Sequence, residues 1–366
     1  MVVQGGRVSA VGPAATTEMP AGVTIVDAAG KVLTPAFVHA GTRLGLRGNG
    51  GGNANLVDAS RRVEEELDPW LDENRWAAAN GFATLGLLPG EGIVGGRGAA
   101  VRAAGADIES MLRRADTVLR VDVTQGARFS NALAGQLAAA RKDLDALAKW
   151  ETERAAWEKA KAAAEAEKKP VPAEPKKPDQ PDDREPYRKV LRGETALWCL
   201  VGNSADVVAL RDALADEAVR GAKLRLVCAL SGDAYRAAPE LLDLGARCVV
   251  RASLASWPNS DLTVCPAVLL RNAGLPVALL PRDDSRDGLR NFRIDLAGVV
   301  SAGFPRAAAL RAATAETAAL LGLGEGAGTI AAGARADFVL WTGDPLQATS
   351  RLERVWIDGR PVEETP

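Results

Sequence analysis

Short runs of apolar residues recur through the middle of the chain, separated by longer stretches rich in Ala, Leu and charged residues. The runs lie at 83–88, 195–201, 224–230, 247–250 and 276–280. They lack polar–apolar alternation, which is typical of strands buried on both faces of a parallel sheet. Segments with a helical pattern, 206–219 and 234–244, lie between them. The pattern therefore predicts an α/β fold with a parallel sheet covered by helices.

The N-terminal end of the chain follows a different pattern. Within residues 1–33, two short alternating runs at 6–12 and 23–27 are each closed by Gly or Pro. Such runs are typical of strands joined by turns. The C-terminal end is also rich in strand and turn signals, so we expect a small sheet at each end of the chain.

One segment, 131–187, interrupts the alternation of strands and helices. Ala, Lys, Glu and Arg dominate 131–167, and Leu recurs at spacings near three, four and seven, which predicts a long amphipathic helix. Prolines then recur every two or three residues and apolar side chains are scarce, which excludes a helix and a packed core. We expect a disordered linker there. The alternative is a tethered partner-docking helix anchored by Trp150 and Trp157.

Composition excludes several classes of protein. The chain has 366 residues and a formal net charge of −2, so its overall charge does not favour nucleic acid or anionic lipid. It has no apolar run of about 18 residues, the length that a membrane-spanning helix needs. The N-terminus lacks a signal-peptide pattern, and the four cysteines form no CxxC pair. We expect a cytoplasmic protein, an expectation that stays open if the first strand begins upstream of Met1.

The chain contains a single histidine, His39. Mechanisms that need two histidines in one chain are therefore excluded, among them those of HExxH metalloproteases. The sequence also has no GxSxG motif, so a serine triad of the α/β-hydrolase type is poorly supported.

Two parts of the chain carry a family resemblance. Residues 30–45, Gly-Lys-Val-Leu-Thr-Pro-Ala-Phe-Val-His-Ala-Gly-Thr-Arg-Leu-Gly, resemble the start of the barrel in the amidohydrolase superfamily, in its imidazolonepropionase-like branch. The C-terminal part is similar to the same family over 307–314, 328–346 and 355–362. The glycine-rich stretch 89–101 resembles a loop of that branch.

The resemblance implies a fold and an activity. The fold is a TIM-type (β/α)8 barrel over 34–328, which includes the helical and Pro-rich insertion 131–187. A small β-sandwich is implied by the two chain ends together, 1–33 and 329–366. The family hydrolyses non-peptide C–N bonds, with zinc or another divalent metal that generates hydroxide from bound water.

The metal-binding residues of that family are missing here. In the first motif, Gly41 and Arg43 stand at the two histidine positions, and Gly202 and Leu230 fall where later histidines are expected. None of these side chains offers a lone pair to a metal. We therefore predict no bound metal and no other cofactor.

A few residues remain as candidates at the barrel mouth. The resemblance places the final aspartate of the family at Asp283 or Asp284, and these carboxylates with His39 are the candidate catalytic residues. Arg43 and Arg282 each follow a barrel strand and are candidates for binding an anionic ligand. The glycine-rich stretch that begins at Arg47 is expected to form a loop over the mouth.

These residues lead to three hypotheses. The first is a catalytically degenerate amidohydrolase-like protein that acts as a scaffold, with an intact amidohydrolase homologue or a second copy of itself as partner. The second is an active, metal-poor hydrolase that uses His39 with Asp283 or Asp284. The third is a protein that binds a small anionic ligand at the barrel mouth through Arg43 and Arg282.

Overall fold

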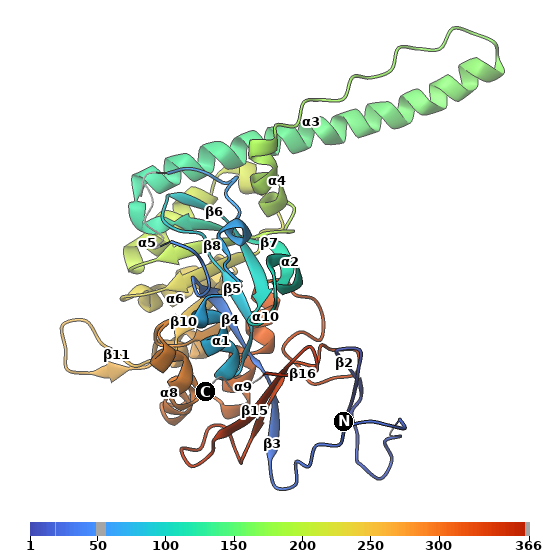
Figure 1. Ribbon diagram of the computed structural model, residues 1–366. Helices are drawn as coiled ribbons and strands as arrows, with labels where there is room; N and C mark the ends of the chain where they lie inside the picture. The colour runs from blue at the N-terminus through green and yellow to red at the C-terminus, as the bar shows by residue number, and fades with distance from the viewer. Residues whose placement is uncertain (19, 49–55, 363–366) are drawn as a thin grey trace.

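The computed structural model describes residues 1–18, 20–48 and 56–362. Its centre is an eight-stranded sheet in the order β13-β10-β9-β8-β7-β6-β5-β4 (Figure 1). The strands are β4 (Phe37–Thr42), β5 (Phe82–Leu87), β6 (Val94–Arg102), β7 (Leu112–Asp122), β8 (Ala196–Val201), β9 (Leu226–Leu230), β10 (Arg247–Arg251) and β13 (Val277–Leu280). The predicted α/β fold with a barrel-like sheet is confirmed. The glycine-rich loop predicted over the mouth lies mostly outside the described residues.

One strand departs from a regular (β/α)8 barrel, in which all strands are parallel. β6 runs antiparallel to both of its neighbours, whereas the other neighbouring pairs in the sheet are parallel. The reason is local: a short glycine-containing turn joins β5 directly to β6, with no helix between them to carry the chain back. Among the described residues, no backbone ladder joins the two end strands, β13 and β4.

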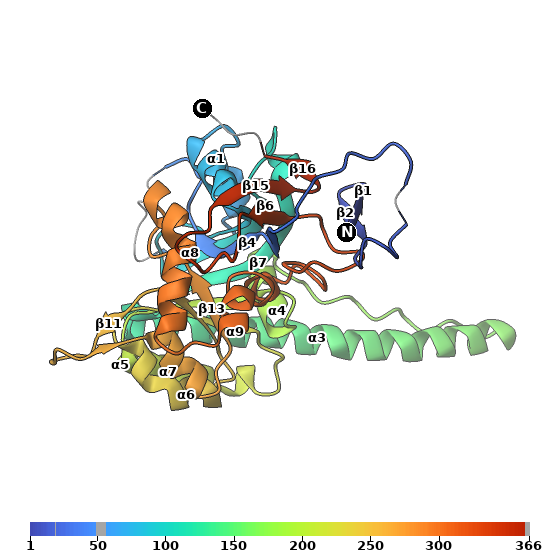
Figure 2. The same cartoon turned by 90° about the horizontal axis from the view of Figure 1, so that it is seen from below.

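Helices cover the outside of the barrel (Figure 2). They are α1 (Asp72–Ala79), α2 (Ile108–Met111), α5 (Ser204–Leu214), α6 (Ala238–Asp243), α7 (Pro266–Asn272), α8 (Arg286–Ser301), α9 (Arg306–Ala312) and α10 (Ala315–Leu320). A short hairpin of β11 (Ala255–Ser256) and β12 (Thr263–Val264) projects beside them. The start of α5 follows from its sequence: the Asn203 side chain accepts from the backbone N–H of Ala205 and Asp206, a capping box.

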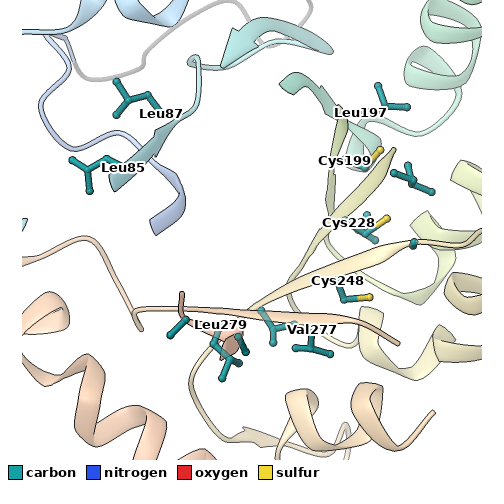
Figure 3. Packing of buried hydrophobic residues seen from close by; sticks show 14 of the residues in the cluster. Leu85, Leu87, Leu197, Cys199, Cys228, Cys248, Val277 and Leu279 are labelled. Carbon is teal, nitrogen blue, oxygen red and sulfur yellow. The ribbon is translucent and has the colours of Figure 1, made fainter. Parts of the chain in front are cut away.

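The apolar residues divide between two cores. In β8, Leu197 and Cys199 point outward into the large core between strands and helices, while Trp198 points into the barrel. Cys199, Cys228 and Cys248 lie in register on adjacent strands and are fully buried as free thiols (Figure 3). Side chains therefore fill the barrel interior, and it is not an open channel.

The two ends of the chain meet in one small sheet. β3 (Val32–Pro35), from before the barrel, pairs with β14 (Phe338–Trp341), which continues through β15 (Leu352–Ile357) to β16 (Arg360–Pro361). β1 (Val2–Gln4) and β2 (Arg7–Ala10) form a separate hairpin. Its Val8 packs against Phe338 and Trp356. A β-sandwich needs a second sheet packed on the first, and the hairpin supplies only two strands of one. A complete β-sandwich therefore stays a prediction.

The strand expected at 23–27 is wrong. No strand forms there, and Ile25 is 75% exposed. The apolar alternation finds no neighbouring strand edge to pair with, so the local signal is not used.

The insertion forms an arm that extends beyond the rest of the molecule (Figure 1). The predicted long helix is α3 (Ala127–Ala166), whose first half packs on the barrel through Phe129, Leu133 and Leu137. The Pro-rich segment 167–181, which we call the strap, is not helical and returns along α3. Trp150 Nε1 donates to the Pro175 carbonyl (3.0 Å) and Trp157 Nε1 to that of Pro172 (2.8 Å).

The composition of the strap predicts a disordered linker, whereas in the structure the strap accepts hydrogen bonds from two tryptophans of α3. The physical reason is that two tryptophans of α3 supply donors and ring surfaces to a chain that cannot form its own hydrogen bonds. Lys177 also lies over the Trp150 ring, 5.6 Å from its centroid. The domain boundaries themselves stay predictions.

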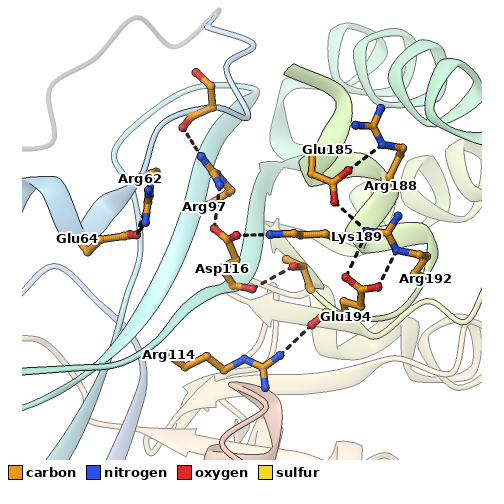
Figure 4. A network of polar contacts seen from close by, with 12 residues as sticks. Arg62, Glu64, Arg97, Arg114, Asp116, Glu185, Arg188, Lys189, Arg192 and Glu194 are labelled. Carbon is orange, nitrogen blue, oxygen red and sulfur yellow. Dashed lines mark hydrogen bonds and ion pairs between the residues drawn. The ribbon is translucent and has the colours of Figure 1, made fainter. Parts of the chain in front are cut away.

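A short helix, α4 (Glu185–Leu191), fixes the base of the arm. Arg188 is buried and donates to Asp143 of α3 (2.9 Å) and to Glu185 (2.8 Å). On the barrel side, Lys189 pairs with Asp116 of β7 (2.6 Å), which also accepts from Arg97 (3.0 Å; Figure 4). Ion pairs therefore bind the arm to the β6–β7 hairpin.

No helix among the described residues combines the length and the apolar character needed to cross a membrane.

Candidate functional site

The structure brings one predicted pair together at the barrel mouth. His39 is the third of the six residues of β4, and Asp284 follows the carboxyl end of β13. His39 Nε2 is 3.3 Å from Asp284 Oδ1. His39 is fully buried, while the Asp284 side chain is 33% exposed. This contact spans the seam between β4 and β13, where no backbone ladder is found in the described chain.

Two further residues complete the surroundings of Asp284. Thr42 Oγ1 donates to Asp284 Oδ2 (2.6 Å), and Arg251 Nη1 lies 3.9 Å from Oδ1. Burial raises the pKa of Asp284, but His39, the Thr42 hydroxyl and the Arg251 charge outweigh burial and hold the pKa well below its usual range. Thr42 and Arg251 were missed from the sequence. Both are the last residues of barrel strands, which is the signal that could have identified them.

The other predicted aspartate has a different role. Asp283 Oδ1 accepts the backbone N–H of Ser285 (2.9 Å) and the Ser285 hydroxyl, and these bonds hold the pKa of Asp283 below its usual range. Ser285 in turn caps α8 by accepting from the Gly288 N–H (3.0 Å). Asp283 therefore organises the turn into α8 and does not contact His39.

The two predicted arginines are not brought together. Arg43 Nη1 donates to the Leu88 carbonyl (3.2 Å), and its Nη2 lies 3.4 Å from Glu66 Oε2. Arg61 binds the other oxygen of the same carboxylate (2.7 Å). Arg282 is exposed beside Asp283. Arg43 is thus already engaged by a carboxylate, and Arg282 lies outside this cluster.

Trp198, from across the barrel, occupies the space beside Gly41, the position at which the family resemblance leads us to expect a histidine. A Cβ added to Gly41 would lie 2.7 Å from Trp198 Cζ2 and 2.9 Å from Leu88 Cδ1. Trp198 is 1% exposed, so its indole cannot move into solvent. Gly202, another expected ligand position, donates its N–H to Asp206 at the start of α5 (2.8 Å). Packing and helix capping therefore use the space that metal ligands would need.

The donor set at the mouth does not fit a divalent metal. Around Asp284 it consists of one carboxylate, one imidazole, one hydroxyl and the positive charge of Arg251. Within the described part of the chain, no three His, Cys, Asp or Glu side chains are grouped closely enough to hold a metal ion. Zinc sites use three or four such ligands, and a guanidinium repels a cation.

The chemistry left to the site is limited. Both ring nitrogens of His39 are buried and lack a hydrogen-bond partner among the described residues, so the imidazole cannot reach a substrate as a general base. Asp284 is partly accessible, but its low pKa makes it a weak base at neutral pH. The arrangement is suited to holding β4 against β13 across the seam.

Comparisons with known proteins agree with this fold. The model of the family described as "Amidohydrolase family" matches residues 276–363, a segment that includes Asp284. The chain is 42% identical over 64 residues to Amidohydrolase tasK of Hapsidospora irregularis, which is 18% of this chain and 6% of that protein. This relative therefore informs only a small segment.

Two solved structures cover nearly the whole chain. An amidohydrolase from Thermotoga maritima MSB8 is 23% identical, with a TM-score of 0.72 over 100% of this chain and 94% of its own. A molinate hydrolase is 14% identical, with a TM-score of 0.55 over 98% of this chain and 89% of its own. At these identities the likeness shows the fold alone. The C-terminal segment thus matches the model of the amidohydrolase family, and the whole chain shares its fold with a solved amidohydrolase.

Proposed function

We propose that this chain is a degenerate member of the imidazolonepropionase-like branch of the amidohydrolases, which does not hydrolyse C–N bonds and acts as a scaffold. The observation that carries the proposal is the donor set at the mouth. Its one carboxylate, Asp284, accepts from Thr42 and lies beside His39 and Arg251, and no second carboxylate accompanies it among the described residues.

The packing inside the barrel supports the same proposal. An indole at Trp198 and a glycine at position 41 form a complementary pair, which leaves no space for a histidine side chain at position 41. A site that only lost its ligands would leave a cavity, which destabilises a protein. Here the space is filled, which favours a barrel maintained for its structure.

The partner of this scaffold is an intact amidohydrolase homologue or a second copy of the chain. The arm formed by α3 and the strap supports a role in association because it extends beyond the barrel (Figure 1). Its tryptophans are engaged by the strap. A partner would therefore bind the assembled arm and not bare tryptophan rings.

The contacts at the mouth favour neither of the two alternatives, a metal-poor hydrolase or a receptor for a small anion. A metal-poor hydrolase would need a base that reaches substrate, and the nitrogens of His39 are buried. An anion receptor at the mouth would need Arg43 to leave Glu66.

The test is metal content together with hydrolysis. Purified protein is incubated with zinc, manganese or iron, desalted, and measured by elemental analysis. It is then assayed on a panel of cyclic amides, acyl amino acids and Xaa-Pro dipeptides. We expect well under one equivalent of metal and no turnover above that of the Asp284→Asn variant. One equivalent of tightly held metal, or turnover that Asp284→Asn abolishes, would overturn the proposal.

A further inference from the structure

A cavity of about 380 Å³ lies at the end of the barrel opposite the mouth. The first residues of β4, β5 and β7 line it, together with a glycine-rich loop after α10 and the approach to β14. Its volume falls in the range of pockets that hold small organic ligands. The residues discussed for the mouth take no part in it.

The walls of this cavity have two chemical characters. Part of the lining is apolar and consists of Ala36, Val38, Ala83, Leu323 and Ala327. The charged part of the lining is Arg113, Arg114 and Arg335, with Asp337 as its one acidic side chain. The cavity is therefore suited to a ligand with an apolar body and a negative charge.

The acidic side chain is already neutralised. Arg113 binds Asp337 with both terminal nitrogens (2.6 and 3.2 Å), and Asp337 also accepts the backbone N–H of Asp358 (2.8 Å). Arg335 pairs with Asp358 (3.1 Å). These groups compensate one another, so they do not oppose an anion in the cavity.

Arg114 is different because it has no acidic partner. It donates to two backbone carbonyls, those of Gly322 and of Glu194 (3.1 Å; Figure 4). Among the described residues, no carboxylate lies within ion-pair distance of it. A guanidinium has five N–H donors, so Arg114 keeps donors for a ligand.

A second arginine lies against Arg114. Arg225 donates to the carbonyls of Ala319 (3.1 Å) and Leu320 (2.9 Å). A Cβ on Gly322 would lie 3.1 Å from Arg114 Nη1 and 3.2 Å from Arg225 Nη1, so both guanidinium groups contact the same glycine. Burial lowers the pKa of Arg225, and the charge of Arg114 lowers it further. Two cations without a carboxylate favour the binding of an anion nearby.

We propose that this cavity binds a small monocarboxylate with a short apolar chain or ring. The carboxylate would accept from the free N–H groups of Arg114, and the apolar body would lie against Ala83, Leu323 and Ala327. Arg114 is the one arginine of the lining without a carboxylate partner among the described residues, which matches a single negative charge, and the apolar part of the lining disfavours inorganic anions. The proposal does not depend on the function proposed for the mouth.

Calorimetry on the full chain tests the proposal, with hexanoate and benzoate as probes. We expect both acids to bind and 1-hexanol, benzyl alcohol and inorganic phosphate to bind at least tenfold more weakly. The Arg114→Gln variant should weaken hexanoate binding at least tenfold. The matched control is Arg286→Gln, an exposed arginine at the start of α8 and outside the lining, which should leave binding unchanged.

A second variant keeps the test decisive if Arg114→Gln fails to fold. Ala327→Leu fills the cavity without changing charge and should also abolish hexanoate binding, with thermal unfolding as the check on folding. Three results would each overturn the proposal: no binding of either acid, phosphate binding as tight as hexanoate, or hexanoate binding that survives both variants.

Discussion

At the scale of single residues, the contact between His39 and Asp284 is the main polar contact at the barrel mouth. It lies where the backbone ladder between β4 and β13 is missing from the described chain. A carboxylate that accepts from a hydroxyl and lies beside an imidazole can hold two strands in place without backbone pairing. The single histidine of the chain thus has a structural role, in the contact that holds β4 against β13.

Asp284→Asn should lower stability in a pH-dependent way. The folded-state pKa of Asp284 is depressed, so its contribution is present above the unfolded value, about 3.9, and is lost as pH falls through the folded value. We expect the variant to be about 1–2 kcal/mol less stable at pH 7, the scale of a hydrogen bond to a charged group reduced for partial exposure. Urea unfolding at pH 7 and at acidic pH measures the difference.

The neighbouring carboxylate supplies the control. Asp283→Asn should have a smaller effect at pH 7, because Asp283 is exposed and contacts only the turn. A stability gap for Asp284→Asn that widens as the pH falls would contradict the assignment.

The pair of Gly41 and Trp198 predicts coupled substitutions. Gly41→Ala places a methyl group 2.7 Å from the indole, which should cost about 1–3 kcal/mol through overpacking. Trp198→Phe removes the ring atoms that clash, so the double variant should lose less stability than the sum of the single variants. Denaturant unfolding of all four proteins gives the coupling free energy. Additive losses would show that the indole does not limit position 41.

At the scale of elements, the arm shows how a Pro-rich chain can follow a helix. Prolines cannot donate backbone hydrogen bonds, but their carbonyls still accept. The strap uses them as acceptors for the indoles of α3. The ordering of the strap therefore depends on two donors and not on a core.

Replacing Trp150 and Trp157 together by Phe should loosen the strap. The rings stay, but both indole N–H donors are lost, at about 1 kcal/mol each. We expect trypsin to cut after Lys168 and Lys176 at least about fivefold faster than in the wild type, since about 1.4 kcal/mol is a factor of ten. Glu151→Gln, an exposed residue of α3, is the control. If the wild-type strap is cut as fast as the variant, it is not held by the tryptophans.

At the scale of the whole molecule, the outer part of the arm extends beyond the barrel, while the first half of α3 packs on it (Figure 1). Gln180 donates to the Asp143 carbonyl (3.1 Å), so the two ends of the arm lie next to each other at its base. The ion pairs of Asp143 with Arg184 and Arg188 lie on the barrel side of that point.

Replacing 146–178 by a short Gly/Ser linker should therefore leave the barrel folded. We expect the Tm to stay within about 3 °C, because a change of 1 kcal/mol moves the Tm of a domain this large by only a few degrees. Calorimetry measures it. Asp143→Asn in the shortened chain is the positive control, since it removes the partner of buried Arg188 and should destabilise strongly. A large fall in Tm on shortening alone would show that the arm is part of the core.

The sequence by itself determined the elements whose signals are local. Unbroken apolar runs between helical patterns predicted the barrel strands, because strands buried on both faces carry no polar side. Helix-forming residues at regular spacing predicted α3, and the dense prolines excluded a helix in the strap. The count of one histidine was by itself enough to exclude a multi-histidine site.

Only the tertiary structure decided the features that join distant residues. Asp283 and Asp284 are equivalent in sequence, but the capped turn into α8 directs one to Ser285 and the other to His39. The filling of position 41 by Trp198 depends on packing across the barrel. Such contacts leave no periodic signal along the chain, because their partners are brought together only when the barrel closes.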